Sequence, residues 1–231
     1  MEPNREKRGQ FIIIAVLLAA IMIVSIGALM HSAVTYYKHE PWEEYSTLIG
    51  DIEINSRRLV ELSLASYTNS FEPDKAILGS NLEKWQNDLD NIYPSSGIIL
   101  TSNLSNGGIL DPIWNIPTST SSASTKFTLD IRSIGLEGYT FEVVSSLSLT
   151  IVSSTSLNAT SKEIIALVTS ETGMPVPELD ETNFRIENST IMAVDPNYDT
   201  GNILEYRILY DGPLSPVVEV WDQRGIRVVG R

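Results

Sequence analysis

Cysteine is absent from the 231-residue sequence, and histidine occurs only twice, as His31 and His39. Without thiols the chain can form no disulfide bond and no iron–sulfur cluster, and most structural zinc sites are excluded. A Ser–His–Asp catalytic set needs an imidazole beside the serine, and the sequence beyond residue 39 contains none. These absences remove most routes to nucleophilic and metal-dependent catalysis.

Positive charge is also scarce, since 16 Lys and Arg residues stand against 29 Asp and Glu residues, for a formal net charge of -13. An acidic surface repels the phosphates of nucleic acids. Carboxylate pairs such as Asp180 and Glu181 are typical of solvated loops, and no sugar cleft is indicated around them. We therefore expect a protein that is not an enzyme, that needs no cofactor and that binds no nucleic acid.

A long apolar run is the most distinctive feature of the chain. Phe11–Met30 holds twenty residues without a charge, and a helix of that length matches the ~30 Å hydrocarbon core of a bilayer. Arg5, Lys7 and Arg8 precede the run and acidic residues follow it, so the positive-inside rule places the N-terminus in the cytoplasm. The sequence predicts a single-pass cell-membrane protein with a transmembrane helix over residues 10–33 and an extracytoplasmic C-terminal part.

The residues that lead into this run carry a second signal. Lys7-Arg8-Gly9-Gln10-Phe11 is a basic pair, a small residue and a polar residue directly before the hydrophobic helix. Over residues 7–30 the pattern resembles the class III signal of archaeal type IV pilin-like surface proteins. The resemblance implies cleavage by a prepilin peptidase between Gly9 and Gln10, and packing of the apolar helices of many copies into a filament core.

One position departs from the bacterial version of this pattern. Bacterial pilins have a glutamate five residues into the mature chain, where this sequence has Ile14. An uncleaved signal anchor is an open alternative for residues 1–33. A cleaved secretory signal peptide is a second one.

Two amphipathic helices are predicted after the apolar run. Pro41 marks the first turn of a new helix or a kink. Apolar residues then recur at spacings of three, four and seven, at Tyr45, Leu48, Ile49, Ile52, Leu59 and Leu62. A second stripe begins after Pro73-Asp74 and ends before Pro94, and it consists of Leu78, Leu82, Trp85, Leu89 and Ile92. We interpret residues 34–94 as an external two-helix stalk, with residues 1–9 as a basic cytoplasmic tail.

The remainder of the chain has the pattern of β-structure. Residues 95–126 read as a Ser/Thr-rich connection with short strands, in which Asn106-Gly107-Gly108 predicts a turn and Thr118–Thr125 (TSTSSAST) a polar linker or a strand edge. Residues 127–231 form the predicted head. Alternating residues indicate strands at Phe127–Ile131, Tyr139–Val143, Leu147–Ile151, Glu163–Thr169, Phe184–Glu187, Leu204–Tyr210, Val217–Trp221 and Ile226–Val229. A bulge is expected at Ser145-Ser146, and a hairpin loop at Asp222–Gly225.

This spacing of strands predicts an antiparallel immunoglobulin-like β-sandwich. With the helices before it, the chain is expected to adopt an α+β fold.

Two kinds of site are suggested by short motifs. Asp195, Asn197 and Asp199 place oxygen-bearing side chains at alternate positions, as in a weak calcium loop. The glycine and glutamate that an EF-hand requires at loop positions six and twelve are missing, and a polar β-turn explains the same residues. Asn103, Asn158 and Asn188 each begin an Asn-x-Ser/Thr triplet, the acceptor pattern of N-glycosylation.

These observations favour a membrane-anchored structural or adhesive protein of the cell surface, as a pilin-like subunit whose partners are the membrane, other copies or envelope proteins. A monomeric surface module that recognises an extracellular ligand or an envelope protein is the first alternative. An anchored hydrolase is the second.

Overall fold

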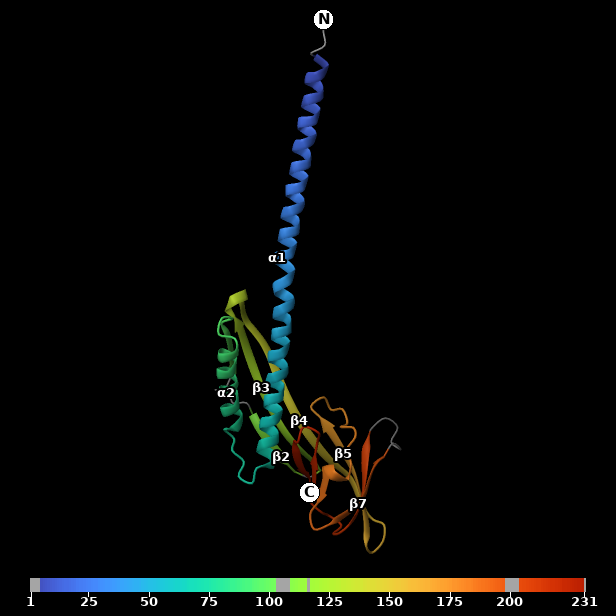
Figure 1. Ribbon diagram of the computed structural model, residues 1–231. Coiled ribbons are helices and arrows are strands. Elements are labelled where there is room, and N and C mark those ends of the chain that lie inside the picture. Colours follow the sequence, from blue (N-terminus) through green and yellow to red (C-terminus); the bar gives the residue numbers. More distant parts are fainter. Residues whose placement is uncertain (1–4, 103–108, 116, 198–203, 231) are drawn as a thin grey trace. The chain divides into compact units, whose positions relative to one another are not determined.

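The computed structural model describes residues 5–102, 109–115, 117–197 and 204–230; within them, side chains are described except for 5–15, 33–44, 109 and 197. The chain divides into two compact units, Met1–Ile52 and Glu53–Arg231. The first helix, α1 (Arg5–Asn69), contributes to both (Figure 1). A second helix, α2 (Ile77–Ile92), and all of the strands described below belong to the second unit.

The predicted transmembrane helix over residues 10–33 is not supported. A span needs about 20 predominantly apolar residues in one helix. Among the described residues, no helix contains a stretch that is both long and apolar enough to cross a bilayer. The prediction of a single-pass membrane protein with a cytoplasmic N-terminus and an extracytoplasmic head is therefore corrected.

The helix does not end at Pro41, where the sequence predicted a new first turn or a kink. α1 is assigned as one helix from Arg5 to Asn69. A proline in a helix removes one backbone hydrogen bond, at a cost of about 3 kcal/mol. The helical turns on both sides of Pro41 outweigh that single loss.

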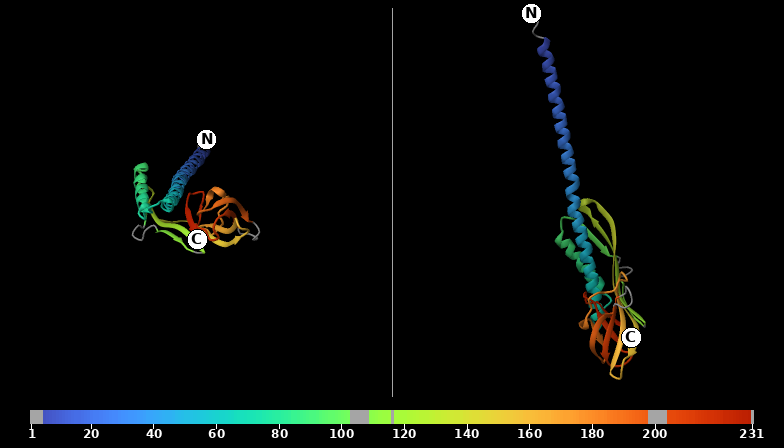
Figure 2. Two further views of the ribbon diagram at one scale, coloured as in Figure 1. Left: turned by 90° about the horizontal axis from the view of Figure 1, so that it is seen from below. Right: turned by 90° about the vertical axis from the view of Figure 1, so that its right-hand side faces the viewer.

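The predicted two-helix stalk is also wrong, because residues 53–69 of α1 and the whole of α2 are part of the same compact unit as the strands. Figure 2 shows residues 53–69 of α1 and the whole of α2 on one side of the large sheet. The buried face of α1 in this unit consists of Ser56, Val60, Ser63, Leu64, Tyr67 and Thr68. In α2 the predicted leucines Leu78, Leu82 and Leu89 are buried, whereas Ile92 is exposed.

The strands form two antiparallel sheets. The larger has the order β1-β3-β4-β5-β8-β7, and β2 pairs with β3 beside β1. Its strands are β1 (Ile98–Ser102), β2 (Ile109–Trp114), β3 (Thr118–Ile131), β4 (Leu136–Ser156), β5 (Ser161–Ser170), β7 (Thr190–Asn197) and β8 (Glu205–Asp211). The smaller sheet has the order β10-β9-β6, from β6 (Phe184–Ile186), β9 (Val218–Trp221) and β10 (Arg227–Gly230). Two short 3₁₀ turns, η2 (Arg132–Ile134) and η3 (Glu181–Asn183), precede β4 and β6.

The two sheets fit a β-sandwich, as the sequence predicted. β10 packs on β3 and β4, and the Ser121 hydroxyl of β3 donates a 2.6 Å hydrogen bond to the backbone oxygen of Arg227 in β10. The immunoglobulin-like assignment is not supported. An immunoglobulin sandwich divides short strands almost evenly between two sheets, whereas in the described part of this chain one sheet holds seven strands and the other three.

The strand β3 includes Thr118–Thr125, for which the sequence was compatible with either a polar linker or a strand edge. Along β3 every second side chain is buried, from Ser119 and Ser121 through Phe127 to Ile131. β3 lies between β4 on one side and β1 and β2 on the other, so it is an interior strand. Small inward side chains leave room for β10 to pack closely on this part of the sheet.

The bulge predicted in the neighbouring strand β4 is not found at the predicted position. The sequence placed a bulge at Ser145-Ser146, but β4 is continuous through those residues. The register between β4 and β5 shifts later, between Ile151 and Ser153. Ser145 instead points inward as a fully buried small residue.

The hairpin between β9 and β10 agrees with the sequence prediction. Gly225 has a φ of 78°, in the left-handed region that favours glycine, and its N–H donates to the backbone carbonyl oxygen of Asp222 at 2.9 Å. The Asp222 carboxylate accepts the backbone N–H groups of Arg224 and Ile226, both at 3.0 Å. Asp222 is therefore a structural acceptor that fixes the loop.

Candidate binding surfaces

The first candidate surface is the stretch of α1 from residue 16 to residue 30, here called the apolar segment. Ten of its large hydrophobic side chains are between 53% and 71% exposed, at Val16, Leu17, Leu18, Ile21, Met22, Ile23, Val24, Ile26, Leu29 and Met30. Successive helical residues are 100° apart, so these positions cover all sides of the helix. A helix that is apolar all round is normally covered by other groups.

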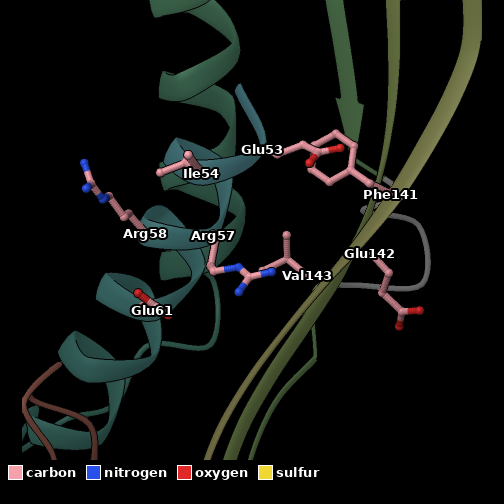
Figure 3. A pocket seen from close by; sticks show the side chains of 8 residues that line it. All are labelled: Glu53, Ile54, Arg57, Arg58, Glu61, Phe141, Glu142 and Val143. Carbon is pink, nitrogen blue, oxygen red and sulfur yellow. The ribbon is translucent and has the colours of Figure 1, made fainter. Parts of the chain in front are cut away.

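The second candidate surface is a groove of about 420 Å³ between α1 and β4, here called the α1–β4 groove. Five residues of α1 and three of β4 line it: Glu53, Ile54, Arg57, Arg58, Glu61, Phe141, Glu142 and Val143. In Figure 3, Arg57 extends from α1 towards Val143, Arg58 points away from β4, and Glu142 points away from α1. Arg57 is thus the cation that faces into the groove.

The electrostatics of the α1–β4 groove are mixed. Tyr139 donates a 2.6 Å hydrogen bond to the Glu53 carboxylate, and this bond raises the pKa of the Tyr139 hydroxyl, with burial and the carboxylate charge as smaller causes. Phe141 stacks on Phe127 with ring centroids 5.0 Å apart, which gives the groove an aromatic wall. Within the described part of the chain, Arg57 forms no hydrogen bond or ion pair and is free to take an external carboxylate or phosphate.

One end of this groove meets a cluster of charges around Arg224. Its guanidinium lies 2.7 Å from the Asp222 carboxylate, 2.9 Å from Glu171 and 3.6 Å from Glu61. It also donates to the Ser145 hydroxyl and to the Ser146 carbonyl. Arg224 therefore connects α1, β4, the loop after β5 and the β9–β10 hairpin.

Protonation in this cluster is governed by opposing effects. Burial alone would raise the pKa of the Glu171 carboxyl, but hydrogen bonds from its own backbone and from Arg224, with the Arg224 charge, lower it overall. Burial alone would lower the pKa of Arg224, but Asp222 and Glu171 raise it overall. The cluster is a set of satisfied ion pairs, and its chemistry is structural.

The third candidate surface is a groove of about 430 Å³ between α1 and α2, here called the α1–α2 groove. It is lined by Asn55, Arg58, Leu59 and Leu62 of α1 and by Asn81, Lys84, Trp85 and Asp88 of α2. Leu62 was predicted on the buried stripe of α1, but it is 63% exposed. Its outward position gives the groove an apolar floor.

The structure places the predicted metal ligands on or beyond β7. Asp195 is exposed on β7 and lies opposite Arg207 of β8. Asn197 ends that strand, and Asp199 lies outside the described residues. Among the residues whose side chains are described, no cluster of three or more His, Asp or Glu groups is suited to hold a metal ion.

The predicted modification sites are placed in part. Asn158 and Asn188 are both exposed, and the Asn158 side-chain oxygen accepts the Thr160 and Ser161 N–H groups in a turn after β4. Asn188 has a φ of 53° in the turn before β7. Asn103 lies outside the described residues, as does the predicted turn at residues 106–108. Gly9 and Gln10, the predicted processing site, lie within α1.

Sequence reasoning missed both grooves, since it treated α1 and α2 as a separate stalk. Arg57 carried a weak signal, because it adjoins Arg58 in a segment dominated by acidic and apolar residues. The exposed position of Leu62 had no signal in apolar periodicity alone, because the serines at 56 and 63 occupy the buried face.

The described part of the chain thus combines a β-sandwich with two helices and two grooves. Comparison of the chain with protein-family models, with curated proteins and with solved structures finds no match in any of the three.

Proposed function

We propose that the protein is a structural or adhesive subunit that associates with other copies of itself through the apolar segment. The observation that carries this proposal is the exposure of ten large hydrophobic side chains on all sides of one helix. The resemblance of residues 7–30 to archaeal type IV pilin-like proteins supports it, because subunits of that family pack their apolar helices together.

The free energy available from such packing is large. Complete burial of an aliphatic side chain contributes about 1.5–3 kcal/mol, so covering half of the surface of ten contributes on the order of 7–15 kcal/mol. Association costs about 4–15 kcal/mol in lost freedom. A contact with one neighbour is therefore close to balance, and contacts with several neighbours are favourable.

The test is the mass distribution of the full chain by analytical ultracentrifugation over a range of concentrations. We expect large assemblies for the natural sequence and a strong shift to monomer for Ile23→Asp. Val152→Asp is the matched control, since Val152 is 51% exposed on β4, outside the apolar segment. A monomer at every concentration for the natural chain would overturn the proposal.

Mass spectrometry of the chain isolated from its source tests the pilin-like part separately. A chain that begins at Gln10 supports prepilin-type processing. A chain that begins at Met1 contradicts that processing, while self-association remains to be judged from the ultracentrifuge.

A second candidate function is a monomeric binding module, and the α1–β4 groove favours it. Arg57 faces into this groove and has no partner among the described residues. A guanidinium in that position suits a carboxylate ligand. Titration of the full chain with citrate, followed through the Nε–H signal of Arg57 by nuclear magnetic resonance, would show saturable shifts that Arg57→Gln removes; a linear response would count against it.

We propose no catalytic role. The chain has only two histidines, both before residue 40, and no cysteine. The carboxylates of the α1–β4 groove lie beside arginines and an aromatic wall, and no serine or threonine lines it. Binding by surface complementarity is the chemistry that these residues support.

A further inference from the structure

The α1–α2 groove has a geometry suited to one particular kind of partner. The two helices are joined by hydrogen bonds from the Trp85 indole to Ser56, at 3.2 Å, and from the Asn81 amide to Ser63, at 3.0 Å. These bonds hold α2 beside α1, and residues of both helices line the groove. The groove is thus a permanent feature of the second unit.

The lining residues follow the same spacing on both helices. Residues 55, 58, 59 and 62 of α1 lie at i, i+3, i+4 and i+7, and residues 81, 84, 85 and 88 of α2 do the same. Each set is one face of its helix over two turns. Two such faces on neighbouring helices flank the position that a third helix takes in a helical bundle.

The chemistry of the groove selects an apolar helix. Leu59, Leu62 and Trp85 form its hydrophobic part, and Leu62 is 63% exposed. Arg58 and Lys84 have long aliphatic stems that can lie along an apolar helix while their charges remain in water. A charged peptide would leave the leucines poorly covered.

The chain itself contains a helix of the required kind and length. The apolar segment has no charged residue, and its fifteen residues span about 22 Å at 1.5 Å per residue. The groove is lined over eight residues of each helix, about 12 Å, so one face of the segment is long enough to cover it from end to end.

We propose that the apolar segment of one copy docks in the α1–α2 groove of a second copy. This inference rests on the proposed function, because it names the surface that receives the segment. The contact joins two different surfaces of the same chain, so it leaves a free groove at one end and a free segment at the other. Repetition of such a head-to-tail contact yields an open-ended assembly unless the rotation between copies closes a ring.

The absence of cysteine permits a direct test. In the full-length double variant Ile23→Cys/Leu62→Cys the only thiols are the two introduced ones, one on the segment and one in the groove. A disulfide requires Cα atoms about 4.4–6.8 Å apart. Mild oxidation is expected to give a ladder of covalent oligomers, with 23–62 linkages between chains identified by mass spectrometry. Ile23→Cys/Val152→Cys is the control and is expected to give no 23–152 linkage above background.

The outcomes separate this inference from the proposed function. If assemblies form but contain only 23–23 linkages, the groove is not the receptor and the inference fails while self-association stands. If no assembly forms, both fail. A 23–62 linkage within one chain also overturns the inference.

A second variant keeps the test independent of disulfide geometry. Leu62→Glu places a charge on the groove floor at an exposed position, where the fold has no need of leucine. The concentration at which half of the chain is assembled is expected to rise at least tenfold, and by less than twofold for Val152→Glu. Equal shifts for the two variants would contradict the inference.

Discussion

Replacement of Arg227 by methionine is expected to weaken the second unit substantially. The Arg227 guanidinium lies 5.6 Å from the ring centroid of Trp114 and 5.7 Å from that of Trp221, and 2.6 Å from the Glu219 carboxylate. It also donates to the carbonyl oxygen of Thr68 in the last turn of α1, at 3.4 Å. Methionine retains most of the aliphatic stem and removes every one of these polar contacts.

The magnitude follows from the burial of the ion pair. The side chains of Arg227 and Glu219 are only 24% and 16% exposed, and Glu219 Oε2 is buried without a hydrogen-bond partner. Loss of a hydrogen bond to a charged group costs about 1.5–3 kcal/mol, and each cation–π contact about 0.5–1 kcal/mol. The sum is about 2.5–5 kcal/mol, which agrees with about 3–5 kcal/mol for removing one partner of a buried pair.

Urea unfolding monitored by circular dichroism measures the effect. Arg207→Met is the matched control, because Arg207 pairs with Glu163 at the surface and is 45% exposed; a loss below about 1 kcal/mol is expected there. The double variant Arg227→Met/Glu219→Gln should recover part of the loss, since it removes the unpaired carboxylate. If Arg227→Met costs no more than Arg207→Met, the assignment of Arg227 as a buried link is refuted.

Three further predictions concern single positions of the second unit. Because hydrogen bonds and the Arg224 charge hold the pKa of the Glu171 carboxyl below its ordinary value, its contribution to stability is present above that value and is lost as the pH falls through the folded-state pKa. The urea midpoints of the natural chain and Glu171→Gln should therefore converge on acidification, and a difference that does not shrink would contradict the hydrogen-bonded carboxylate. Ser63→Leu should lower the free energy of unfolding by about 1–3 kcal/mol, because it overpacks a fully buried site. Ser66→Leu, at an exposed site of the same helix, should lower it by under about 0.5 kcal/mol. Equal losses for the two variants would contradict the packing. Gly225→Ala should lower the free energy of unfolding by about 1–2 kcal/mol, because Gly225 has a positive φ. Gly50→Ala in α1 should not destabilise the protein, since no atom lies within 4 Å of the added carbon. A neutral Gly225→Ala would count against the turn geometry.

The strands of the second half of the chain were largely predictable from alternation. β5, β6, β8, β9 and β10 lie where the sequence placed them, and in all of these but β10 burial alternates with period two. β7 (Thr190–Asn197) was missed, since its Asp, Pro and Asn residues resemble a turn. Pro196 is tolerated there because β7 is an edge strand.

The helices were predictable as helices but not in their packing. A search for apolar periodicity passes over serine, yet Ser56 and Ser63 lie on the buried face of α1. The search also failed to detect the inward face of this part of β3, where Ser119, Ser121 and Thr125 are buried. Small hydroxyl residues permit close approach of packed elements and satisfy their hydrogen bonds locally, as Ser63 does with the Leu59 carbonyl at 2.7 Å. The polar composition therefore concealed the buried face of α1.

A subunit held by α1 needs that helix to be fastened to its sheets, and the second unit shows how this is done. Asn69, at the end of α1, accepts the Trp221 indole N–H at 2.7 Å and donates to the Gly225 carbonyl at 2.8 Å. The Thr68 hydroxyl accepts the backbone N–H of Arg227 at 3.1 Å. This hydrogen bond also satisfies a backbone donor of β10, which lies at the edge of its sheet. The last turn of α1 thus forms four hydrogen bonds with the β9–β10 hairpin, since Arg227 also donates to the Thr68 carbonyl, in addition to its buried apolar face. Because these bonds join backbone and side chains within the second unit, force applied along α1 must break them together with the packing of Leu64 and Tyr67 before the helix separates from the sheets. This arrangement suits a protein whose proposed contacts with its neighbours are made through the same helix.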